Sequence, residues 1–106
     1  MQLMLQEIEK KLAKYPLYSQ EDKGFDARIV VKYFDIFGGG TWLITEGTYE
    51  NGRWLFFGYI TLDGVTWEWG YVTLNELRQL NVKFPRIERD LYMQKNITVR
   101  QYLQGK

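Results

Sequence analysis

The sequence contains neither cysteine nor histidine. Without cysteine there is no disulfide framework and no thiolate chemistry. Without histidine the chain lacks the commonest general base, the usual zinc ligand and every nucleophile that depends on a Ser-His or Cys-His pair. Any catalysis would have to rest on carboxylates, lysines or tyrosines. We therefore expect a protein that is not an enzyme and that needs no cofactor.

Long apolar runs are also missing. Neither end of the chain carries a stretch that could span a membrane or serve as a secretory signal. The chain has 106 residues, and 45% of them are hydrophobic, which is enough for one core and too little for two. We expect one domain over residues 1–106, located in the cytoplasm and without a membrane partner.

Acidic residues are scarce in the last part of the chain. Residues 78–106 contain 7 Lys or Arg against 2 Asp or Glu, whereas residues 1–77 contain 7 against 11. A basic segment of this kind can contact nucleic acid, and Arg86, Lys95 and Arg100 are the candidates for that role. The segment can equally be solvated and pair with the acidic first part of the chain.

Two turn signals organise the middle of the sequence. Asn51-Gly52 and Asp63-Gly64 each indicate a two-residue hairpin turn, and Gly38-Gly39-Gly40 indicates a break. The strands predicted between these signals cover residues 27–36, 41–49, 53–62 and 65–72. Because short turns force neighbouring strands to pair antiparallel, the predicted order is a 1-2-3-4 meander.

Helices are predicted on both sides of the meander. Apolar residues recur at spacings of three and four from Met1 to Leu12, which predicts a helix over residues 2–14, followed by a polar loop over residues 17–26. Thr73 and Glu76 form a capping box that begins a short helix over residues 74–80.

The last part of the chain predicts a fifth strand over residues 86–93 and a helical turn over residues 98–103. The fold class is therefore α+β: an antiparallel β-meander of four to five strands with an N-terminal helix and one or two short helices.

Strand alternation makes both faces of the predicted sheet apolar. The helices can cover one face, so the second is left to loops and the C-terminal turn. Three alternatives are open for that second face. It is packed under those segments, it associates with a partner or a second copy of the chain, or it stacks nucleic-acid bases. The candidate partner-binding residues are aromatic: Trp42, Tyr59, Trp67, Trp69 and, from the polar loop, Tyr18.

Glu88 and Asp90 flank Arg89, so an extended strand would project both carboxylates from one face. Together with Glu46 they could supply oxygen ligands to Mg²⁺ or Mn²⁺. The interpretation that we favour is structural: the carboxylates pair with Arg28 or Arg53 and no metal binds.

Several short motifs occur in an order that resembles a bacterial domain-of-unknown-function family, number 2958. They are Leu17-Tyr18-Ser19-Gln20, Lys32-Tyr33-Phe34, Thr41-Trp42, Thr45-Glu46-Gly47, Phe56-Phe57-Gly58-Tyr59, Gly70-Tyr71-Val72-Thr73-Leu74-Asn75-Glu76-Leu77 and Ile87-Glu88-Arg89-Asp90-Leu91-Tyr92. The resemblance implies an origin on plasmids, conjugative elements or phages, near anti-restriction and DNA-processing genes. It carries over no activity and no catalytic residue.

The chain departs from the family pattern in two places. Gly38-Gly39-Gly40 stands where the family has a longer, Trp-containing connection, and Arg86 stands where a proline is usual.

The functional hypothesis is an interaction module of a mobile genetic element that binds a host protein, in counter-defence. The alternatives are a nucleic-acid-binding accessory protein, which would use the basic C-terminal segment and an aromatic sheet face, and a small carboxylate-dependent metal enzyme.

Overall fold

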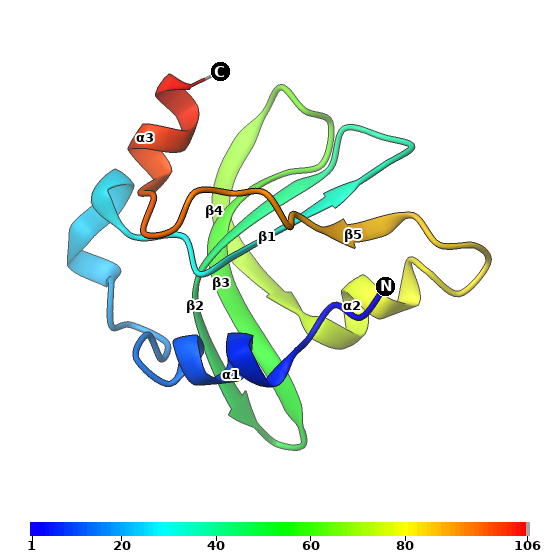
Figure 1. The fold of residues 1–106 in the computed structure, drawn as a ribbon, viewed down its shortest axis with the longest axis horizontal. Coiled ribbons are helices and arrows are strands. Elements are labelled where there is room, and N and C mark those ends of the chain that lie inside the picture. The colour runs from blue at the N-terminus through cyan, green and yellow to red at the C-terminus, as the bar shows by residue number, and fades with distance from the viewer. Residues whose placement is uncertain (106) are drawn as a thin grey trace.

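The structure is a computed structural model that describes residues 1–105. Its elements, in chain order, are α1 (Gln6–Leu12), the 3₁₀ helix η1 (Glu21–Asp26), β1 (Val31–Asp35), β2 (Thr41–Glu50), β3 (Arg53–Thr61), β4 (Trp67–Thr73), α2 (Leu74–Gln79), β5 (Ile87–Arg89) and α3 (Val99–Gln104) (Figure 1). The α+β class is confirmed. No helix within residues 1–105 has the length and apolar character needed to cross a membrane.

All five strands belong to one antiparallel sheet with the order β4-β3-β2-β1-β5. The predicted meander is confirmed, and β5 adds to its free edge beside β1. The turn at Asn51-Gly52 is tight: both residues have positive φ, 53° and 76°, and they join the cross-strand pair Glu50 and Arg53. This geometry is the reason that Asn-Gly predicts a hairpin so strongly.

The second hairpin differs from its prediction. Pairing of β3 with β4 ends at Thr61 and Trp67, so residues 62–66 form a wider loop than the two-residue turn expected. The Asp63 carboxylate organises this loop by accepting hydrogen bonds from the amides of Val65 and Thr66, at 2.8 and 2.7 Å. An aspartate side chain that accepts from backbone amides ahead of it supplies an Asx-turn, which here gives two amides of the loop a partner.

Several elements are shorter than predicted because tertiary contacts replace local pairing. Residues 2–5 precede α1 in non-helical conformation, and the Tyr33 hydroxyl holds them by donating a 2.6 Å hydrogen bond to the Leu3 carbonyl. The first strand begins at Val31 because the Ile29 amide donates instead to the Ile97 carbonyl. The fifth strand has three residues. The predicted polar loop over residues 17–26 contains η1.

Both short helices after the meander begin with a capping box. In α2 the Thr73 hydroxyl accepts from the Glu76 amide and the Glu76 carboxylate accepts from the Thr73 amide, as predicted. Thr98 and Gln101 make the same reciprocal pair at the start of α3. Each box satisfies two amides that the first helical turn leaves without a partner.

The two faces of the sheet are covered unequally. Helices α1 and α2 pack on one face, which holds the main core of Leu3, Ile8, Leu12, Val30, Val31, Tyr33, Trp42, Ile44, Phe56, Val72, Leu74, Leu77 and Ile87. On the other face α3 and the segment before it cover a smaller core of Ile29, Leu43 and Val99 (Figure 1). The β3–β4 part of this second face is covered much less, and the candidate site lies there.

Candidate functional site

Six aromatic side chains form what we call the aromatic surface: Phe25, Phe57, Tyr59, Trp67, Trp69 and Tyr71. Five of them come from β3 and β4, where alternation points odd-numbered residues away from the main core. Register completes the arrangement, because Phe57 pairs with Tyr71 and Tyr59 pairs with Trp69 across the two strands.

The rings of the aromatic surface are in continuous contact. Phe57 stacks on Trp69 with centroids 5.7 Å apart, and Tyr59 stacks on Trp67 at 5.2 Å. A contact of 4.8 Å between Tyr59 and Trp69 joins the two stacks. Phe25 of η1 meets Tyr59 edge-on at 5.2 Å. Pairs in these geometries contribute roughly 0.5–1.5 kcal/mol each beyond their buried area, so the rings are held in place before any partner binds.

This surface is partly open to solvent. Tyr71 is 53% exposed, and Trp69 is 36% exposed although it packs against three other rings. Phe57, Tyr59 and Trp67 are half-buried. Exposed and contiguous aromatic area is uncommon on an unpartnered face.

Tyr18 extends the aromatic surface at its Tyr71 end. It has a positive φ of 75° and an exposed ring, which forms a side-chain hydrogen bond with Tyr71. The pKa of the Tyr71 phenol is raised by partial desolvation, by this hydrogen bond and by the negative charges of Glu46 and Glu21. The same end of the surface is therefore aromatic and acidic.

Glu46 positions the loop that carries Tyr18. Its buried carboxylate accepts hydrogen bonds from the amides of Tyr18 and Gln20, each at 2.8 Å. The side chain of Gln20 donates to the carbonyls of Arg28 and Thr45 and accepts from the Arg28 amide. Glu46 and Gln20 thus fix residues 18–20 against β2.

The aromatic residues that the sequence singled out divide between the two faces. Tyr18, Tyr59, Trp67 and Trp69 gather at the aromatic surface. Trp42 does not: it is 5% exposed and belongs to the main core, because its position on β2 points toward the helices. Trp42 as an exposed ring is therefore a wrong expectation. Alternation along β3 and β4 contains the signal for Phe57 and Tyr71, whereas Phe25 arrives from a loop that no local pattern places.

The basic candidates do not share one surface. Arg86 makes a two-pronged contact with Asp35, with Nη2 and Oδ2 2.6 Å apart. That contact is the first cause of the lowered pKa of Asp35. Arg100 pairs with Asp26 at 2.9 Å and lies over the Phe25 ring. Both arginines thus pair with carboxylates from the first part of the chain. The charge distribution left this pairing open as the alternative to nucleic-acid contact.

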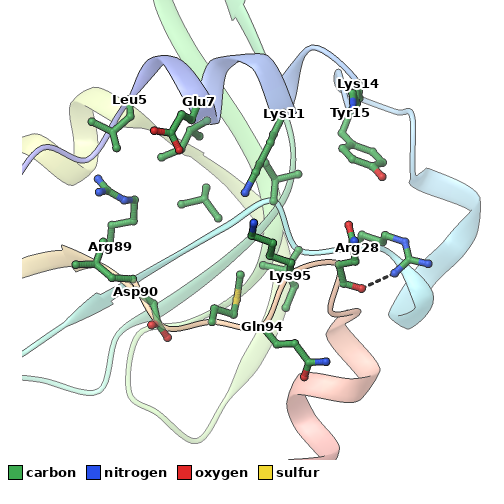
Figure 2. Close-up of a pocket in the computed structure, with 17 residues that line it drawn as sticks. Leu5, Glu7, Lys11, Lys14, Tyr15, Arg28, Arg89, Asp90, Gln94 and Lys95 are labelled. Atoms are coloured by element: carbon green, nitrogen blue, oxygen red, sulfur yellow. Dashed lines mark hydrogen bonds between the residues drawn. The ribbon is translucent and has the colours of Figure 1, made fainter.

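Lys95 lies in a different place, on the wall of what we call the basic cleft. This cleft has a volume of about 420 Å³ and runs between α1 and the segment that follows β5 (Figure 2). Its basic lining residues are Lys11, Lys14, Arg28, Arg89 and Lys95, and its acidic ones are Glu7 and Asp90. No local sequence pattern indicates the cleft, because Lys11 and Lys14 are far from Lys95 in the chain.

The carboxylates considered as metal ligands do not converge. Within residues 1–105 no group of three or more acidic side chains is placed to hold a metal ion. Glu46 uses both carboxylate oxygens on backbone amides, and Asp90 pairs with Lys32 at 3.3 Å. The ion-pair partner of Asp90 is thus Lys32, where Arg28 or Arg53 was expected.

Residues 3–105 match the family described as "Protein of unknown function (DUF2958)". The chain belongs to this family. No curated protein and no solved structure shows a significant match to this chain.

Many of the DUF2958 motif residues have structural roles in this chain. Gln20 and Glu46 fix the loop over residues 18–20, and Thr73 with Glu76 caps α2. Gly58 allows β2 and β3 to approach closely, because a Cβ there would lie 2.0 Å from the Leu43 carbonyl oxygen. Three rings of the aromatic surface, Phe57, Tyr59 and Tyr71, also belong to these motifs.

Proposed function

We propose that the protein is a non-enzymatic interaction module that binds a protein partner through the aromatic surface. The observation that carries this proposal is the run of stacked, half-open rings on β3 and β4. Trp and Tyr are enriched at the energetic centres of protein interfaces. Rings already held by stacking lose little conformational freedom when a partner covers them, which favours binding.

Charge favours a protein over nucleic acid as the occupant. Glu46 and Glu21 act on Tyr71 at one end of the surface, and a phosphate backbone would be repelled there. A partner with Lys or Arg beside an apolar patch would complement both features. The resemblance to proteins of mobile genetic elements suggests a host protein in the cytoplasm as the partner, with counter-defence as the purpose.

The test compares two single-ring deletions in capture from host lysate. Trp69→Ala removes the ring that joins the stacks, and Tyr92→Ala removes the most exposed tyrosine, which is 93% exposed and outside the aromatic surface. We expect a captured protein to be retained by wild type and Tyr92→Ala and lost with Trp69→Ala. Once that protein is purified, calorimetry should show an affinity loss of at least about 30-fold for Trp69→Ala, as expected for a central aromatic residue. Circular dichroism checks that each variant folds.

Three outcomes would overturn the proposal. The first is equal loss of capture in both variants. The second is tight and salt-sensitive retardation of single-stranded DNA that Trp69→Ala abolishes, which would assign the surface to nucleic acid. The third is a dimer in analytical ultracentrifugation that Trp69→Ala converts to monomer, which would make a second copy of the chain the occupant.

A further inference from the structure

The basic cleft brings together cations from three separate parts of the chain. Lys11 and Lys14 come from α1 and the residues after it, Arg28 precedes β1, and Lys95 follows β5. In Figure 2 the side chains of Lys11 and Lys95 extend into the cleft from opposite sides. The cleft shares no residue with the aromatic surface.

The acidic residues of the cleft do not balance these charges. Asp90 is engaged with Lys32. Within residues 1–105, Glu7 forms no ion pair, and none involves Lys11, Lys14 or Lys95. Arg28 and Arg89 donate to the backbone carbonyls of Asn96 and Gln2, which carry no net charge. Cations that face one another repel, and an anion between them would relieve the repulsion.

The shape of the cleft indicates the size of the anion. Its volume of about 420 Å³ falls in the range of roughly 300–1,000 Å³ that is usual for small-molecule sites. Apolar side chains line it as well: Leu5, Ile8, Ile29, Val31 and Met93. A concave site with an apolar lining and facing ammonium groups suits a compact ligand that has an anionic head and a carbon framework.

We propose that the basic cleft binds a phosphate monoester of nucleotide size, with the phosphate between Lys11 and Lys95. Lysine binds phosphate as a point charge, and two lysines on opposite walls match the double charge of a terminal phosphate. The same phosphate chemistry can come from a free nucleotide or from the phosphorylated end of a nucleic-acid strand.

Calorimetry on the full chain tests this site with five probes: inorganic phosphate, adenosine 5′-monophosphate, adenosine, and a short single strand with and without a 5′-phosphate. We expect the monophosphate to bind and adenosine not to bind. Lys11→Gln and Lys95→Gln should each weaken binding about tenfold, because each removes one charge-assisted contact. Lys10→Gln is the matched control, since Lys10 is an exposed neighbour on α1 outside the cleft. It should leave the affinity within about twofold.

The strand probes identify the source of the phosphate. If the 5′-phosphorylated strand binds and its unphosphorylated twin does not, the site reads a strand end, and the proposed chemistry holds. If the monophosphate binds no better than adenosine and both strands bind equally, the proposal is wrong. It is equally wrong if Lys10→Gln weakens binding as much as Lys11→Gln. Thermal unfolding without ligand shows that the variants fold, and Lys95→Gln should melt no lower than wild type because it relieves repulsion.

Discussion

The carboxylate of Glu46 accepts a 2.8 Å hydrogen bond from the backbone amide of Gln20, 26 positions earlier in the chain. Both residues are 3% exposed. No ion pair within residues 1–105 involves Glu46, so amide donors are what stabilise its buried charge. A carboxylate held this way is a strong positional constraint, since hydrogen bonds to a charged group are about twice as strong as neutral ones. The Glu46 carboxylate thereby fixes the position of Tyr18 at one end of the aromatic surface.

Replacing Glu46 by glutamine should therefore destabilise the protein. The amide that replaces the carboxylate keeps one acceptor and turns an NH₂ group toward a backbone donor, so one buried amide loses its partner. We expect Glu46→Gln to lower the free energy of unfolding by about 2 kcal/mol in urea titration. Glu50→Gln, at the exposed end of the same strand, should change it by less than about 0.5 kcal/mol. Equal effects from the two variants would refute the role of Glu46.

Two glycines paired across β3 and β4 should differ in how replacement by alanine changes the stability of the protein. A Cβ at Gly58 would lie 2.0 Å from the carbonyl oxygen of Leu43, whereas a Cβ at its partner Gly70 would have no heavy atom within 4 Å. Gly58→Ala should cost about 3 kcal/mol or more in thermal unfolding, because a backbone atom must move. Gly70→Ala should be neutral or stabilise slightly, since alanine restricts the unfolded chain. A well-tolerated Gly58→Ala would contradict the close approach of β2 and β3.

The loop between β3 and β4 should depend on pH through Asp63. Hydrogen bonds from the amides of Thr66 and Val65 and from the Thr61 hydroxyl lower the pKa of Asp63 from the usual 3.8 to about 2. Because the folded pKa lies below the unfolded one, the stabilisation is complete above pH 3.8 and is lost as the pH falls toward about 2. Carbon NMR of the Asp63 carboxyl should show a midpoint near about 2. A midpoint near the usual value would mean that the three hydrogen bonds do not form in solution.

No metal should bind at the carboxylates first considered as ligands, which are Glu46 of β2, Glu88 of β5 and Asp90 after it. Asp90 is paired with Lys32, and Glu46 is engaged by two backbone amides. We expect calorimetric titrations with Mg²⁺ and Mn²⁺ to give no heat of binding. Sub-millimolar binding that disappears in Asp90→Asn would contradict this expectation and would restore the metal-enzyme hypothesis.

Local signals in the sequence predict the meander well because each acts over a few residues. Asn51 and Gly52 adopt the positive φ that a tight hairpin needs, and Thr73 with Glu76 closes its capping box within one turn. Alternation along β4 predicts that Trp67 and Trp69 share a face, and alternation along β3 predicts the same of Phe57 and Tyr59. The predicted two-residue turn would instead have paired Tyr59 with Glu68, so the wider loop is what brings Tyr59 opposite Trp69. In each case the chemistry that determines the structure lies within the segment itself or across one short turn.

The remaining features depend on contacts between distant segments, and no local pattern contains them. Trp42 and Trp69 both lie on apolar strands, yet one is buried and the other half-open, because α1 and α2 cover one face while α3 covers only part of the other. Lys11 and Lys95 face the same cleft because the segment that follows β5 lies across the cleft from α1 (Figure 2). Side-chain alternation gives the direction of each residue, but burial and charge environment depend on which distant element packs against it.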